Sequence, residues 1–186
     1  MILRELGLYR DSFPFDYIPT TPALILKYLR DNTAFFPEKN VITTADGIWF
    51  GHFDLDEGYE TTIATLKRRF QRLYDALAAK KRILFVYSSE ADVYNEMGNR
   101  YNDNYDALYK LCDYIKAAYD YDAFRIVAIH TNRTYIDCAN ITNYTVRVLQ
   151  EYLSDDMSTH TGPIVQQYRQ TLTGLLKQIF VGTTLY

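Results

Sequence analysis

Residues 83–89 read ILFVYSS, residues 104–119 read NYDALYKLCDYIKAAY, and residues 124–130 read FRIVAIH. The first and third stretches are short apolar runs, which are typical of strands buried on both faces. The middle stretch repeats its apolar residues every three or four positions, which predicts an amphipathic helix. A strand, a helix and a strand in this order fold as a right-handed crossover with parallel strands. The sequence therefore predicts the α/β class, as a three-layer domain with a mainly parallel sheet flanked by helices.

Further helices are predicted on both sides of this unit. Thr21 is a suitable cap and Pro22 a suitable first residue for a short helix over 22–31. The apolar spacing of residues 59–80 predicts a long amphipathic helix, and that of residues 162–180 predicts another at the end of the chain. Predicted helices therefore precede and follow the predicted strands along the sequence.

Other extended segments are also predicted. The turn residues 45–47, Ala-Asp-Gly, separate VITT from IWFGHF, so we expect a hairpin or two short extended pieces. The segments YIDC, at 135–138, and YTVRVL, at 144–149, are candidates for additional strands.

Length and composition indicate one packed domain. The chain has 186 residues, of which 48% are hydrophobic and 16% are aromatic. We expect a single α/β domain over 1–186. It would contain a proline-rich segment with a short helix over 1–40, the sheet and its helices over 41–160, and a C-terminal helix over 161–181.

The charge balance and the apolar pattern exclude two classes of partner. The 20 Lys and Arg residues and 23 Asp and Glu residues give a net charge of -3, without the positive field that nonspecific nucleic-acid binding uses. The chain has neither the apolar core of a signal peptide nor a run of about 18 apolar residues. We expect no nucleic-acid partner, no membrane partner and a cytoplasmic location.

Polar side chains follow both buried strands of the predicted crossover. Ser88, Ser89 and Glu90 end the first strand, and His130 and Asn132 end the second. Because the carboxyl ends of parallel strands meet at one edge of the sheet, these residues are candidates to bind a sugar, a nucleotide sugar or a phosphate. Polar residues also follow buried strands wherever a chain must turn, so a structural role is the alternative.

A D-x-D pair follows the aromatic stretch WFGHF. Asp54 and Asp56 are the candidates for holding a divalent metal against a nucleotide diphosphate, and His52 could add a ligand or a proton relay. The same spacing occurs at Asp120 and Asp122, so the pair by itself does not predict a metal centre. We expect no metal and no cofactor.

The two cysteines form no CxxC motif. Cys112 lies on the apolar face of its predicted helix and is expected in the core, whereas Cys138 lies in a polar stretch and is the more accessible thiol. The chain also lacks the G-x-S-x-G, G-x-G-x-x-G and G-x-x-x-x-G-K motifs. Cys138 is therefore the only thiol kept as a candidate nucleophile.

Basic and aromatic residues supply two further binding candidates. Arg68 and Arg69 belong to a basic cluster on the predicted long helix that could bind phosphate or an acidic sugar, or could be a solvated face. The 18 tyrosines suit a protein interface or a sugar-stacking surface, and they also suit a half-buried core.

Five segments together resemble a family of papain-like cysteine peptidases of unestablished activity, found in bacteria and large DNA viruses. In order, they are LRELGL at 3–8, SFPFDYI at 12–18, FGHFD at 50–54, KRRF at 67–70 and ILFV at 83–86. The resemblance spans about residues 3 to 130. It implies the fold of that family, a location in the cytoplasm or within a virus particle, and His52 as the base of a thiol mechanism.

This sequence differs from the family pattern at the position of the proposed nucleophile. The family pattern places an S-L-G segment and a cysteine before the position of residues 3–8, and this sequence has no counterpart for that cysteine. Such a segment upstream of Met1 would restore the thiol mechanism. Without that cysteine, what the resemblance still implies is the fold and a group of Asp16, His52, Arg68 and Arg69, which would bind a ligand or tie the N-terminal segment to the sheet.

We therefore expect a non-catalytic binding or assembly protein that takes a protein partner or self-associates, with enzyme status left open. One alternative is a glycosyl- or phosphate-group transferase that uses Asp54, Asp56 and the strand-end residues. The other is a thiol hydrolase, if the chain continues upstream.

Overall fold

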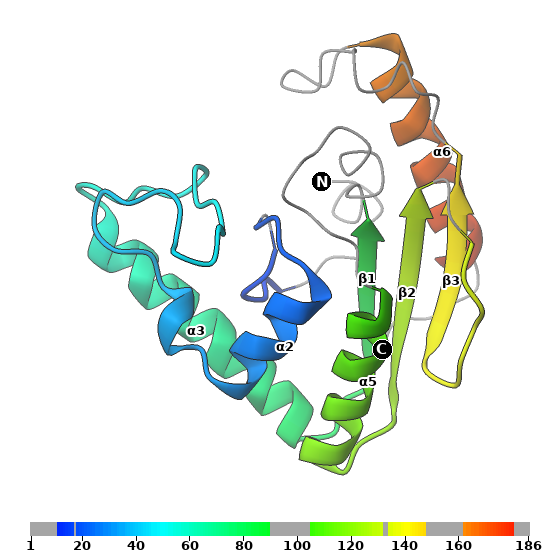
Figure 1. The fold of residues 1–186 in the computed structure, drawn as a ribbon, viewed down its shortest axis with the longest axis horizontal. Helices are drawn as coiled ribbons and strands as arrows, with labels where there is room; N and C mark the ends of the chain where they lie inside the picture. Colours follow the sequence, from blue (N-terminus) through cyan, green and yellow to red (C-terminus); the bar gives the residue numbers. More distant parts are fainter. Residues whose placement is uncertain (1–10, 17, 90–104, 132–133, 148–161, 181–186) are drawn as a thin grey trace. The chain divides into compact units, whose positions relative to one another are not determined.

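The computed structural model describes residues 11–16, 18–89, 105–131, 134–147 and 162–180. In chain order, the elements are α2 (Pro22–Arg30), the 3-10 helix η1 (Thr33–Phe35), α3 (Tyr59–Ala78), β1 (Ile83–Ser89), α5 (Tyr105–Tyr119), β2 (Phe124–Thr131), β3 (Ile141–Val146) and α6 (Pro163–Phe180) (Figure 1). Among the described helices, none is long and apolar enough to cross a membrane.

The three strands form one sheet in the order β1-β2-β3, and their arrows run in the same direction in Figure 1. The pairing of β2 with β3 is parallel and extends from Ile126 opposite Ile141 to Thr131 opposite Val146. Helix α6 packs against β3. The predicted α/β fold with a parallel sheet is confirmed.

The chain divides into two compact units. The first contains β3, α6 and most of β1 and β2, and the second contains α2, η1, α3 and α5. The boundary falls between Phe85 and Val86 in β1 and between Arg125 and Ile126 in β2. The single domain expected over 1–186 stays a prediction.

The core of the second unit is aromatic. The ring of Phe35 lies within 4.9 to 5.7 Å of five other rings, always edge to face. These rings belong to Phe15, Tyr28, Phe36, Phe50 and Phe70. Edge-to-face contacts add to the free energy gained by burial. The cluster joins the N-terminal segment, α2, the hairpin region and α3 within this unit.

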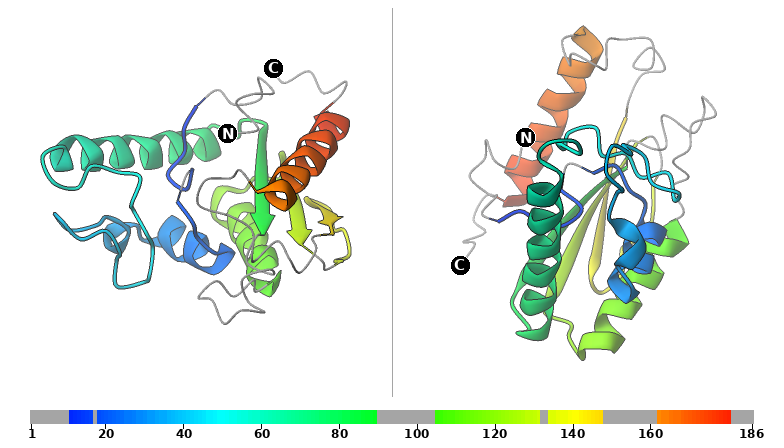
Figure 2. Two further views of the ribbon diagram at one scale, coloured as in Figure 1. Left: turned by 90° about the horizontal axis from the view of Figure 1, so that it is seen from above. Right: turned by 90° about the vertical axis from the view of Figure 1, so that its left-hand side faces the viewer.

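Local sequence signals explain the helices of the second unit. Thr21 caps α2, since its Oγ1 accepts a hydrogen bond from the backbone N of Leu24 at 3.3 Å, and Pro22 is the first helical residue, as predicted. Helix α3 is continuous in Figure 2 and buries the predicted apolar face. Helices α2 and α5 pack side by side, a contact that the sequence did not predict.

A return segment, residues 134–140, connects β2 to the start of β3. Three pairs of residues join it to β3: Thr134 with Thr145, Ile136 with Asn143, and Cys138 with Ile141. As the residue number rises from 134 to 138 along the segment, the number of its partner on β3 falls from 145 to 141. The segment therefore runs antiparallel to β3. Only Cys138 forms a bridge of the β type there, and the strand predicted over 135–138 was wrong. Side chains make the other two contacts.

Candidate functional site

The strand-end candidates lie on neighbouring strands, but they differ in burial. Ser88 and Ser89 are the last residues of β1, and Ser88 is exposed. His130, next to last in β2, is fully buried at 0% exposure. Glu90 and Asn132 lie outside the described residues.

The imidazole of His130 is held by an amide and lies close to two aromatic rings. Its Nε2 is 2.9 Å from Oδ1 of Asn143, and its ring centroid is 4.3 Å from that of Tyr135 and 6.1 Å from that of Tyr87. The amide nitrogen of Asn143 donates to the carbonyl oxygen of Ile136 at 2.9 Å, which directs the amide oxygen toward His130. The Nε2 of His130 is therefore the donor in this bond.

Asn143 connects this histidine to the return segment. Its backbone N donates to Oδ1 of Asp137 at 2.7 Å, and its side chain joins the carbonyl of Ile136 to His130. A buried imidazole needs hydrogen-bond partners, because burying its polar nitrogens without them costs free energy. The hydrogen bond between His130 and Asn143 is therefore a structural one. The sequence did not indicate that Asn143 and Asp137 take part in this arrangement.

The D-x-D pair closes the turn before α3. Oδ1 of Asp54 accepts a hydrogen bond from the backbone N of Asp56 at 3.1 Å, and the carbonyl of Asp54 accepts one from Oγ1 of Thr62 at 2.8 Å. Both carboxylates are exposed near the N-terminus of α3, where negative charge stabilises a helix. In the part of the chain that the structure describes, no three His, Cys, Asp or Glu side chains form a group suited to a metal ion.

The N-terminal segment is tied to α3 by an arginine other than the two candidates. Oδ2 of Asp16 accepts a hydrogen bond from the backbone N of Phe13 at 2.8 Å, and this bond closes a local turn. Nη1 of Arg72 donates to the carbonyl of Ser12 at 2.6 Å. Arg72 thus makes the kind of tie that the sequence assigned to Arg68 and Arg69.

Arg68 and Arg69 each have a local neighbour. Nη2 of Arg68, which is exposed, lies 3.4 Å from Oγ1 of Thr65 one turn earlier on α3. The guanidinium of Arg69 lies 5.9 Å from the ring centroid of Phe53, within the range of a cation–π contact.

The two cysteines are placed as the sequence predicted. Cys112 is 3% exposed on α5, whereas Cys138 is exposed on the return segment. The backbone N of Cys138 donates to the carbonyl of Ile141 at 3.0 Å, so its backbone is fixed against β3.

A hairpin at residues 42–50 presents apolar side chains to solvent. Thr43 and Trp49 form an antiparallel bridge, and the backbone N of Phe50 donates to the carbonyl of Ile42 at 2.7 Å. Val41 and Ile42 are 39% and 54% exposed. We call Val41, Ile42, Trp49 and His52 the hairpin patch.

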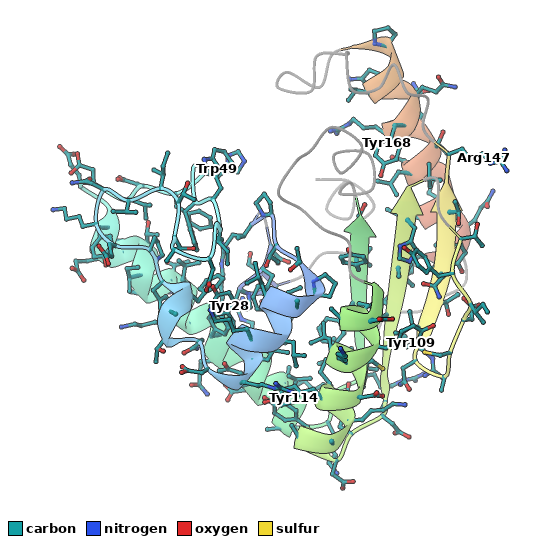
Figure 3. The ribbon with its side chains drawn as sticks, in the orientation of Figure 1. Tyr28, Trp49, Tyr109, Tyr114, Arg147 and Tyr168 are labelled. Carbon is teal, nitrogen blue, oxygen red and sulfur yellow. The ribbon has the colours of Figure 1, made fainter. Side chains whose placement is uncertain are left out.

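The indole of Trp49 (Figure 3) is fixed on this patch by its own chain. Its ring lies over Gly51, where a Cβ would come within 1.9 Å of Cζ2 of Trp49. His52 lies edge-on, with its ring centroid 4.9 Å from that of Trp49. Gly51 is therefore required for this position of the indole, and the ring that contacts the indole edge-on belongs to an exposed residue, His52.

The hairpin turn is anchored to α2. The carboxylate of Asp46 accepts hydrogen bonds from Nζ of Lys27 at 2.8 and 2.6 Å, and it also accepts one from the hydroxyl of Tyr28. The hydrogen bonds from Lys27 and Tyr28 lower the pKa of Asp46 below its usual 3.8. Burial and the bond to Asp46 raise the pKa of Tyr28. The sequence predicted the turn at Asp46-Gly47 but not this anchor.

No family model, no curated protein and no solved structure matches this chain.

Proposed function

We propose that this protein is a non-catalytic binding or assembly protein that binds a protein partner through the hairpin patch. The observation that carries the proposal is the exposure of two successive aliphatic side chains, Val41 and Ile42, at the start of a hairpin that also carries the half-buried Trp49. Burying these side chains against a partner would release apolar surface from water.

The rigidity of the patch supports this proposal. Asp46 fixes the turn to α2, and Gly51 and His52 fix the indole of Trp49. A surface already held in its bound conformation loses less entropy on binding. Tryptophan is also among the residues that contribute most to the affinity of protein interfaces.

We propose that the relation to the papain-like peptidase family is one of fold only. In the mechanism proposed for that family, the position of His52 would supply the base, whereas the imidazole of this His52 lies against Trp49. Cys112 is buried and therefore unsuited to thiol chemistry, and Nε2 of His130 is engaged by Asn143, so the exposed Cys138 is the one thiol in the described residues that such chemistry could use.

The test compares partner capture by the wild type and by the double variant Val41→Ser/Ile42→Ser. Protein immobilised on beads is incubated with a lysate of the cells that produce it, and captured proteins are quantified by mass spectrometry. We expect the double variant to lose capture of the partner by about tenfold, which corresponds to about 1.4 kcal/mol. The control is Ile136→Ser, which removes an aliphatic side chain that is 84% exposed in the other unit.

Sedimentation velocity of the purified protein tests self-association with the same variants. A dimer of the wild type that the double variant abolishes would identify a second copy as the partner. Equal capture and equal association by the wild type and the double variant would reject the hairpin patch as the binding surface.

A further inference from the structure

Acidic side chains flank the hairpin patch. The backbone N of Asn40 donates to the carbonyl of Leu55 at 2.8 Å, and the hydroxyl of Tyr59 donates to the carbonyl of Pro37 at 3.2 Å. These two bonds hold the segment before Val41 beside the segment that leads into α3. Both segments belong to the second unit.

The charge of these two segments is strongly negative. Residues 38–42 and 54–60 carry five carboxylates, all on exposed residues, and one ammonium, that of Lys39. The carboxylates are those of Glu38, Asp54, Asp56, Glu57 and Glu60. The whole chain has a net charge of only -3, so negative charge is concentrated here.

Stabilisation of α3 accounts for only part of this charge. A helix N-terminus carries roughly half a positive elementary charge, which favours nearby carboxylates. Glu60 lies in the first turn of α3, and Asp54 holds the preceding turn. Two cations of α3 also lie near these segments, Lys67 over the ring of Phe36 and Arg69 over that of Phe53. With Lys39 they leave two of the five carboxylates in excess, which is more than the partial charge of the helix offsets, so the segments retain a negative potential in front of a partner.

We propose that the partner presents a basic amphipathic segment, with apolar side chains that bury Val41 and Ile42 and with Lys or Arg side chains that meet the acidic flank. Complementary charge of this kind raises the rate and the selectivity of association, and apolar anchors supply affinity. This inference rests on the proposed function, because it names the chemistry of the partner that the hairpin patch binds.

The test uses the single tryptophan of the chain as its reporter. Trp49 lies on the hairpin patch, so its emission reports binding there. The probes are two short peptides of identical amphipathic spacing and without aromatic residues, one of leucine and lysine and one of leucine and glutamate. Each is titrated at about 0.15 M and about 1 M salt, where the Debye length is about 8 and about 3 Å.

A matched pair of variants isolates the acidic flank. Glu57→Gln/Glu60→Gln removes two of its charges, and Asp106→Asn/Asp113→Asn removes two exposed charges of α5, one of them also in a first helical turn. We expect the lysine peptide to bind and the glutamate peptide not to bind. We also expect the first pair to raise the Kd of the lysine peptide about fivefold, as for two exposed ion pairs, with a weaker salt dependence. The second pair should leave the Kd unchanged.

The outcomes separate this inference from the proposed function. Equal binding of the two peptides, lost in Val41→Ser/Ile42→Ser, would overturn the basic partner and retain the hairpin patch. Binding of the lysine peptide that the serine double variant leaves unchanged would overturn the patch as the anchor, and the inference with it. No binding of either peptide would also overturn the basic partner, while partner capture would still decide the proposed function.

Discussion

Tyrosine hydroxyls stabilise the second unit by donating to backbone carbonyls. The described pairs are Tyr59 with Pro37, Tyr74 with Tyr28, Tyr114 with Leu29, and Tyr121 with Lys81. Tyr28 and Leu29 lie in the last turn of α2, whose carbonyls have no partner within the helix. Tyr74 of α3 and Tyr114 of α5 (Figure 3) therefore supply donors to carbonyls at the C-terminal end of α2. Part of the tyrosine content thus stabilises this helix end.

Replacing Tyr74 tests this use at the level of one hydroxyl. Tyr74→Phe leaves the carbonyl of Tyr28 without this donor, so we expect a loss of about 1 kcal/mol in the free energy of unfolding at pH 7. Burial raises the pKa of Tyr74 from 10.0 to about 12. The wild type should therefore keep the contribution of this hydroxyl below about pH 10 and lose it as the pH rises to about 12.

Urea unfolding between pH 7 and pH 12 measures this effect. The stability of Tyr74→Phe should fall less steeply with pH than that of the wild type. Tyr144→Phe, on β3 in the other unit, is the control for the loss of a tyrosine hydroxyl elsewhere in the chain. Equal slopes for all three proteins would show that the Tyr74 hydroxyl is not held neutral by the fold.

At the scale of elements, the link between β2 and β3 is short for a parallel pair. Such a pair usually needs a crossover of a dozen or more residues, most often with a helix. Here β2 ends at Thr131 and β3 begins at Ile141, and the chain returns as the extended segment 134–140. Asn143 joins this segment to His130, so one side chain supports the connection.

Asn143→Ala should loosen the return segment. The variant removes the acceptor for Nε2 of the buried His130 and the donor to the carbonyl of Ile136. A buried donor left without its acceptor costs about 1–3 kcal/mol, so we expect a loss of that size in the free energy of unfolding. Hydrogen exchange of the backbone N of Cys138, which donates to Ile141, should also become faster.

The neighbouring substitution Thr142→Ala serves as the control on the same strand. It should change neither the exchange rate at Cys138 nor the stability by more than about 0.5 kcal/mol. If Asn143→Ala behaved like this control, the return segment would be held by other contacts.

The elements with local signals could be predicted from the sequence, and those fixed by distant contacts could not. The cap of Thr21 and the apolar periodicity of α3 lie within a few residues of the structure they determine. The start of β3 at Ile141, three residues before the predicted segment, depends on pairing with β2. A single sequence carries no local sign of that pairing.

The candidate site shows the same limit. The turn at Asp46-Gly47 was predictable, because it is a local dipeptide signal. The contact of Asp46 with Lys27 spans 19 residues, and the bond between His130 and Asn143 spans 13, so neither has a local signal. The exposure of Val41 and Ile42 also had no local signal, since aliphatic residues of a hairpin strand are expected inside.

At the scale of the whole molecule, the two units carry different features. The first contains most of the parallel sheet and the bond that engages His130, and the second contains the aromatic core, the hairpin patch and its acidic flank. The proposed binding role therefore belongs to the second unit.

Photo-crosslinking from position 42 tests the binding role most directly. A photoreactive phenylalanine analogue replaces Ile42 in one protein and Ile136 in another, and both are irradiated in the cells that produce the protein. Both side chains are exposed, and they belong to different units. We predict a discrete crosslinked species from position 42 and none from position 136. Crosslinking from position 136 alone, or from neither position, would contradict a partner on the hairpin patch.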